Sequence, residues 1–97
     1  MIRIQATDNP SDITIAIDGQ LVGEYVNEVE TSIREALEQH KDVHLFLRNI
    51  SHIDETGHWL LSRMAAQGVE LSANGLYSSY VVGEIHRALS SSLSRGK

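Results

Sequence analysis

Residues 54–57 read Asp-Glu-Thr-Gly and place a carboxylate, a hydroxyl and a glycine side by side in the chain. The apolar run 43–48 before them predicts a buried strand, and an apolar helix is expected to begin near His58. In an open α/β sheet, ligands and partners usually meet the fold where a strand ends and a helix begins. We therefore expect the functional site around Thr56.

Two catalytic interpretations of this stretch are weak. His52, Asp54 and His58 are candidate metal ligands, but they would have to converge from a loop and a helix start, without a neighbouring carboxylate to orient the histidines. A hydrolytic pair of Thr56 and His58 lacks a third orienting group, and residues two apart on a helix point in different directions. We therefore expect no enzyme, no metal and no cofactor, and keep a small metal-dependent hydrolase as a remote alternative.

The composition is that of one soluble globular domain of 97 residues, with 41% hydrophobic and 22% charged side chains. The formal net charge is −5 and the eight Lys and Arg residues are scattered, which argues against nucleic acid as a partner. Without cysteine there is no disulfide framework and no thiolate zinc site. No signal peptide or membrane span is evident, so we expect a cytoplasmic location without membrane insertion.

Strands and helices are expected to alternate along most of the chain, which predicts a mixed or largely parallel sheet with right-handed crossovers. Phe46 alternates with Val43, Leu45 and Leu47, which indicates a strand covered on both faces. Ser78 or Ser79 is expected to cap the last helix, and a frayed tail is expected from about residue 90. The expected strands are 2–4, 13–17, 43–48 and 68–73, and the expected helices are 25–40, one from about His58, and one carrying Tyr77, Val81, Ile85 and Leu89.

Two segments resemble the STAS domain, the module of sulphate transporters and anti-sigma factor antagonists. Residues 17–21 read Ile-Asp-Gly-Gln-Leu where the family typically reads Leu-x-Gly-x-Leu, and residues 53–57 read Ile-Asp-Glu-Thr-Gly where it reads Ile-Asp-Ser-Ser-Gly. The resemblance covers roughly residues 13–85. It implies an α/β fold, a STAS-like single domain over residues 1–97 with a mixed four-stranded sheet and about three helices.

The resemblance also implies a role for Thr56. In anti-sigma factor antagonists, a partner kinase that also acts as the anti-sigma factor phosphorylates the second hydroxyl residue of the motif, and Thr56 falls on that position. Asp54 and Gly57 would support this phosphosite. The alternative is that Thr56 or Asp54 only caps the helix and that Gly57 only allows close packing. A phosphoryl group would add nearly two negative charges and break a flat docking surface there.

The surface beside Thr56 differs from the family pattern. Glu55 replaces the first serine, His58 stands where leucine is common and Trp59 replaces a small residue, while Phe46 and Val22 stand where the family often has aspartate. An exposed Trp59 would be a binding hot spot, and the alternative is that it packs over the last helix. The residues expected to bind a partner are Glu55, His58, Trp59 and Arg63.

The resemblance favours a cytoplasmic bacterial partner-switching regulator of transcription, of the anti-sigma factor antagonist type, that docks on a kinase-like regulator. The alternative is a constitutive accessory subunit of a membrane transport complex, bound to a transporter ATPase subunit or another scaffold. In that alternative, Thr56 only caps the helix and is not phosphorylated.

Overall fold

A computed structural model describes the backbone of residues 2–95 and the side chains of residues 2–90. The predicted order of strands and helices is confirmed. Among the described residues, no helix combines the length and the apolar content that a membrane span requires. The elements are β1 (Ile2–Asp8), β2 (Asp12–Leu21), α1 (Gly23–Leu37), β3 (Asp42–Ile53), α2 (Glu55–Ala66), β4 (Glu70–Ala73) and α3 (Leu76–Arg95).

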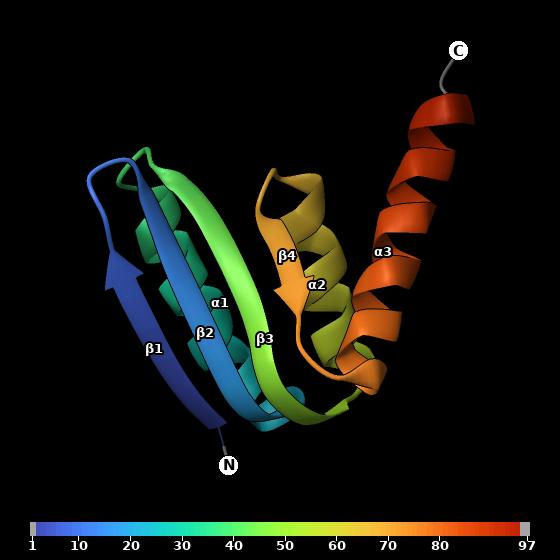
Figure 1. Cartoon of the computed structure of the whole chain (residues 1–97), viewed down its shortest axis with the longest axis horizontal. Helices are drawn as coiled ribbons and strands as arrows, with labels where there is room; N and C mark the ends of the chain where they lie inside the picture. The colour runs from blue at the N-terminus through green and yellow to red at the C-terminus, as the bar shows by residue number, and fades with distance from the viewer. Residues whose placement is uncertain (1, 96–97) are drawn as a thin grey trace.

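The four strands form one mixed sheet in the order β1-β2-β3-β4, as Figure 1 shows. β1 pairs antiparallel to β2, whereas β2, β3 and β4 run parallel to one another. Parallel neighbours need a crossover, and α1 and α2 supply the two crossovers. The mixed sheet predicted from the sequence is therefore confirmed.

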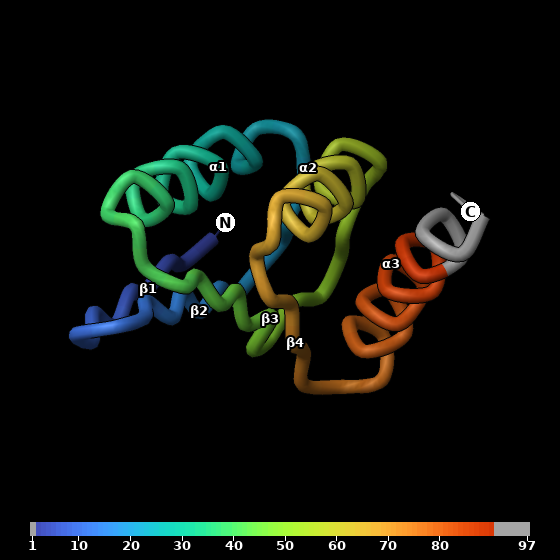
Figure 2. The backbone as a smooth tube through the Cα atoms, turned by 90° about the horizontal axis from the view of Figure 1, so that it is seen from above, coloured from blue at the N-terminus to red at the C-terminus, as the bar shows by residue number. Residues whose placement is uncertain are grey.

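The core lies between the sheet and the two crossover helices. Both crossovers step across the sheet in the same direction, so right-handed connections place α1 and α2 on the same face (Figure 2). α3 lies beside β4 at the edge of the sheet and packs against α2 as well. The fully buried residues of this core include Ile15, Ile17, Leu45 and Leu47 from the strands and Val29, Ile33, Leu60 and Leu61 from the helices.

The prediction that β3 is covered on both faces is wrong. Val43, Leu45 and Leu47 are buried under the helices, but Phe46 on the opposite face is only half-buried. No helix within residues 2–95 lies over that face, because both crossovers use the other face and α3 sits at the β4 edge. We call this second surface of the sheet the open face.

The ends of several elements also differ from the predictions, and β3 and α3 are two examples. β3 continues to Ile53 instead of ending near Arg48, because residues 49–53 keep pairing with the end of β2. α3 begins at Leu76, since the N–H of Ser79 donates to the carbonyl of Gly75 (3.0 Å), so Ser78 and Ser79 are not caps. The α3 backbone runs to Arg95, past position 90 where a tail was expected.

Candidate functional site

The carboxylate of Asp54 joins the starts of two helices. Its Oδ1 accepts a hydrogen bond from the N–H of Gly57 at 2.8 Å and caps α2, while its Oδ2 accepts one from the N–H of Gly23 at 2.8 Å, 31 positions earlier in the chain. Val22, at the N-cap position of α1, offers no side-chain hydrogen bond. Asp54 therefore supplies a cap to both helices.

These hydrogen bonds also fix the ionisation state of Asp54. The N–H of Gly57, followed by that of Gly23, holds the pKa of the Asp54 carboxyl below its ordinary value of 3.8, against the opposing effect of burial. The carboxylate is therefore charged at neutral pH, and both of its oxygens are already occupied by backbone donors.

Gly57 lies where the first turn of α2 presses against the end of β2. A Cβ on this residue would overlap the carbonyl oxygen of Leu21 and come within 2.9 Å of Leu21 Cγ and 3.1 Å of Ile53 Cγ2. The contacting oxygen belongs to the backbone and has little room to move. Close packing therefore requires glycine at position 57, as the sequence predicts.

Thr56 does not cap the helix. α2 begins at Glu55, earlier than the expected start near His58, so Thr56 is the second residue of the helix and Asp54 occupies the capping position. The reason is that Asp54 adopts the extended conformation of an N-cap and bonds to the amide of Gly57, three residues on. The exposed hydroxyl of Thr56 is thus not required for capping.

Thr56, Trp59 and Arg63 lie along one exposed flank of α2, which we call the Thr56 stripe. Their spacing of three and four residues places them on the same side of a helix. The Arg63 guanidinium lies 3.4 Å from the carboxylate of Glu30 on α1, so this flank faces α1. Glu30 also pairs with Arg34 at 2.6 Å. The stripe therefore runs beside α1, and its arginine is already partly neutralised.

Trp59 is 64% exposed, so it does not pack under α3. Glu55 is exposed and, four positions before Trp59, lies next to it on the helix surface. His58 is exposed as well, but it stands two residues from Thr56 and points to a different flank. The structure therefore places Glu55 beside Trp59 in the Thr56 stripe, whereas His58 neighbours Glu55 on the side away from Thr56.

Tyr77 is a site residue that the sequence analysis missed. Its hydroxyl accepts a hydrogen bond from the N–H of Ile53 (3.0 Å) and donates one to the carbonyl of Ile53 (3.2 Å). These bonds tie the start of α3 to the residue before Asp54. The sequence analysis placed Tyr77 only in the apolar stripe of the last helix. A partly buried tyrosine hydroxyl usually finds a hydrogen-bond partner, and this property could have indicated the role of Tyr77.

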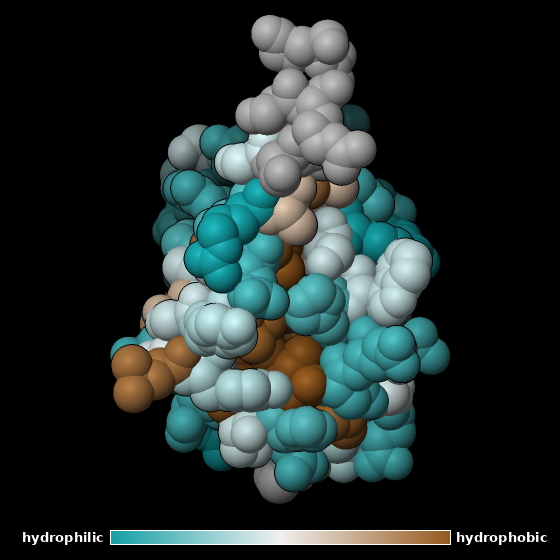
Figure 3. Space-filling model, turned by 90° about the vertical axis from the view of Figure 1, so that its right-hand side faces the viewer, coloured by the Kyte–Doolittle hydropathy of each residue, from teal (hydrophilic) through white to brown (hydrophobic). Residues whose placement is uncertain are grey.

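The side of the molecule formed by α3 also exposes apolar surface. Figure 3 shows apolar atoms gathered in the middle of this side with hydrophilic residues around them. Leu76 is 93% exposed and Tyr80 63% exposed, and the Tyr80 hydroxyl donates to Glu84 at 3.0 Å. The start of α3 thus adds apolar and aromatic surface near the turn that Tyr77 anchors.

The metal interpretation finds no support in the part of the chain that the structure describes, where no three or more His, Cys, Asp or Glu side chains form a group able to hold an ion. Asp54, one of the suggested ligands, has both oxygens engaged by Gly57 and Gly23.

Comparison with known proteins identifies the fold. No family model and no curated protein matches the sequence. Among solved structures, the chain resembles an anti-sigma factor antagonist from Mycobacterium paratuberculosis with a TM-score of 0.68, over 77% of this chain and 69% of that one, at 12% identity. A likeness at this identity concerns the fold. The chain therefore has a STAS-like fold, as the segments 17–21 and 53–57 predict.

Proposed function

We propose that the chain is a protein-interaction module of the anti-sigma factor antagonist type, and that phosphorylation of Thr56 controls its docking on a kinase-like regulator in the bacterial cytoplasm. The fold shared with an anti-sigma factor antagonist supports the type of regulator. The observation that carries the proposal is the exposed Thr56 hydroxyl, which stands on a helix start fixed on either side by Asp54 and Gly57.

A phosphoryl group on Thr56 would act by charge and not by unfolding. It adds nearly two negative charges at pH 7 and three acceptor oxygens at the positive end of α2. Asp54 and Glu55 already place negative charge beside it. The modified stripe would have to lose much of its hydration to fit against a partner, so docking is lost while the fold stays intact.

The Thr56 stripe indicates the character of the partner. Trp59 offers a large exposed aromatic ring, the type of side chain that most often dominates binding energy. Arg63 is held by Glu30, so the stripe carries little free positive charge. We therefore expect the regulator to present an apolar pocket for Trp59, and no cluster of basic residues opposite Thr56 that would attract the added phosphate.

The proposal is tested by pull-down from a native lysate with purified protein, followed by mass spectrometry of the captured partners and of Thr56. The wild type is expected to capture a kinase-like regulator, and a fraction of the protein to carry phosphate on Thr56. Thr56→Glu and Trp59→Ala should lose the regulator, whereas Thr56→Ala should retain it. Exposed residues elsewhere provide matched controls, Thr31→Glu on α1 and Tyr80→Ala on α3, which should capture it like the wild type.

A constitutive accessory subunit is the second candidate, and one observation favours it. Capping and packing fully account for Asp54 and Gly57 without any phosphate. This candidate predicts an unmodified Thr56, capture of a transporter ATPase subunit or another scaffold, no effect of Thr56→Ser and loss of assembly in Trp59→Ala. That set of results would overturn the phosphorylation switch.

A further inference from the structure

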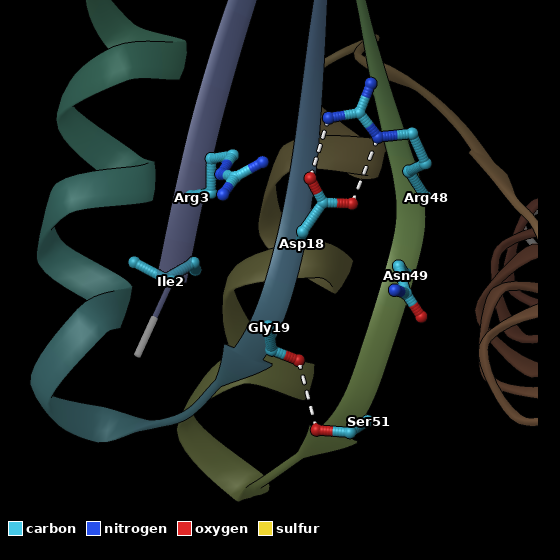
Figure 4. A pocket seen from close by; sticks show the side chains of 7 residues that line it. All are labelled: Ile2, Arg3, Asp18, Gly19, Arg48, Asn49 and Ser51. Carbon is cyan, nitrogen blue, oxygen red and sulfur yellow. Dashed lines mark hydrogen bonds and ion pairs between the residues drawn. The ribbon is translucent and has the colours of Figure 1, made fainter.

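The open face of the sheet carries a hollow of about 570 Å³ that is separate from the Thr56 stripe. Figure 4 shows its lining residues on the start of β1, the last part of β2 and the second half of β3. The volume lies within the range of small-molecule sites. The residues that line it are Ile2, Arg3, Asp18, Gly19, Arg48, Asn49 and Ser51.

Two irregularities in the pairing of β2 with β3 create the hollow. The register shifts between Ile17 and Asp18 and again between Gly19 and Gln20, so Arg48 and Ser51 have no opposite residue in β2. Such bulges bend a strand and re-aim its side chains, and they are common beside binding sites. The pairing defects thus turn polar groups of β3 toward a gap on the open face.

The charges in the hollow are arranged around Asp18. Arg48 donates to Asp18 twice, at 3.0 and 2.7 Å, and once to the Gln5 side chain at 3.3 Å. Arg3 lies opposite Asp18 in the β1–β2 register. The hydrogen bonds from Arg48 hold the pKa of Asp18 below its ordinary value, and the charges of Arg48 and Arg3 act in the same direction. Asp18 is therefore ionised and neutralises one arginine.

Arg3 is the second arginine of the hollow. None of the five ion pairs among the described residues includes Arg3. Two arginines against one aspartate give the hollow one net positive charge, in a chain whose net charge is −5. Figure 4 shows the Arg3 side chain extending from β1 toward β2, on the face where Asp18 and Arg48 meet. A positive site of this kind selects small anions from solution.

We propose that this hollow binds a small molecule through one oxyanion group, a phosphate or a carboxylate. Arg3 supplies the charge, because guanidinium groups match the geometry of both oxyanions and can donate two hydrogen bonds at once. Asn49 and Ser51 line the hollow on the β3 side, where the Ser51 hydroxyl donates to the Gly19 carbonyl at 3.3 Å, and Ile2 lines it at the start of β1. The Arg48–Asp18 pair keeps the floor of the hollow in place and is a positioning element.

The test is a titration followed by two-dimensional amide NMR at low ionic strength, with inorganic phosphate and acetate as separate probes and chloride as the reference salt. One of the two probes is expected to give saturable shifts at residues 3, 19, 49 and 51, and the probe that saturates tells a phosphate site from a carboxylate site. Arg3→Gln should weaken binding by about tenfold or more.

Arg87→Gln removes the same charge from an exposed position on α3 and should leave the affinity unchanged. Thermal unfolding of Arg3→Gln should match the wild type, since Arg3 is exposed on an edge strand. Absence of saturable shifts with both probes would overturn the proposal. So would equal weakening by Arg87→Gln, because it would show a diffuse attraction to charge and not a site.

Discussion

Asp54 and Gly57 differ sharply from Thr56 and Trp59, although the four residues lie within one helix start. The carboxylate of Asp54 is bonded on both sides and Gly57 has no space for a Cβ, whereas Thr56 and Trp59 are exposed. The fold requires the side chain of Asp54 and the absence of one at Gly57, whereas it does not require Thr56 or Trp59. A conspicuous sequence motif can thus combine structural residues with residues available for function.

Gly57→Ala should have the largest effect on stability. The added methyl overlaps the Leu21 carbonyl oxygen, and such overpacking lowers the free energy of unfolding by about 2–3 kcal/mol. Chemical denaturation measures it. Gly83→Ala on α3 is the control, because its Cβ would meet nothing nearer than an Arg87 nitrogen at 3.9 Å and should stabilise the helix by about 0.5–1 kcal/mol. Equal stability of the two variants would remove the architectural role of Gly57.

Asp54→Asn should have the second-largest effect on stability, because it weakens the caps of two helices at once. The folded state lowers the pKa of Asp54, so its contribution is fully present above the ordinary value of 3.8 and is lost as the pH falls through the lower folded pKa. The difference in unfolding free energy between wild type and variant should therefore shrink below pH 3.8.

Denaturation at several pH values measures this difference. The control is Glu55→Gln, which removes a neighbouring exposed carboxylate and should cost less at neutral pH than Asp54→Asn. A difference that stays constant from neutral to strongly acidic pH would contradict the role given to the Asp54 charge.

Tyr77→Phe should have an intermediate effect. It leaves the N–H and the carbonyl of Ile53 without their shared partner, which lowers the free energy of unfolding by about 1–2 kcal/mol. Tyr80→Phe removes a hydroxyl that bonds only to Glu84 at the surface, and should change stability by less than about 0.5 kcal/mol. If both substitutions cost the same, the anchoring of α3 beside Asp54 is not what Tyr77 provides.

Trp59→Ala should have the smallest effect on stability, within about 0.5 kcal/mol, because the ring is 64% exposed. The same substitution should abolish partner capture. A large loss of stability would show that the ring packs against the domain and would erase the contrast between the two pairs of residues.

Most of the fold could be predicted from local patterns. Alternation along β1 and β2 and the stripes of α1 and α2 gave the element order, and the residue types in segment 53–57 pointed to capping and close packing. The open face could not be predicted, because Phe46 in an alternating run looks the same whether or not a helix covers it. The handedness and direction of the crossovers decide that point.

The part of the site that depends on residues distant in the chain could not be predicted from the sequence either. The bond from Gly23 to Asp54 spans 31 positions, and no local pattern announces it. The helix start at Glu55 follows from the capping conformation of Asp54, which competes with Thr56 for the same role. The register shifts beside Arg48 and Ser51 leave no trace in hydrophobic alternation, so the hollow on the open face appeared only with the structure.

The most direct test compares the affinity of the captured regulator for the unmodified protein and for protein phosphorylated on Thr56, measured by calorimetry. Thermal unfolding of both forms is recorded in parallel. We expect phosphorylation to weaken binding by about hundredfold or more while both forms stay folded. Equal affinities of the two folded forms would contradict the claim that Thr56 controls docking.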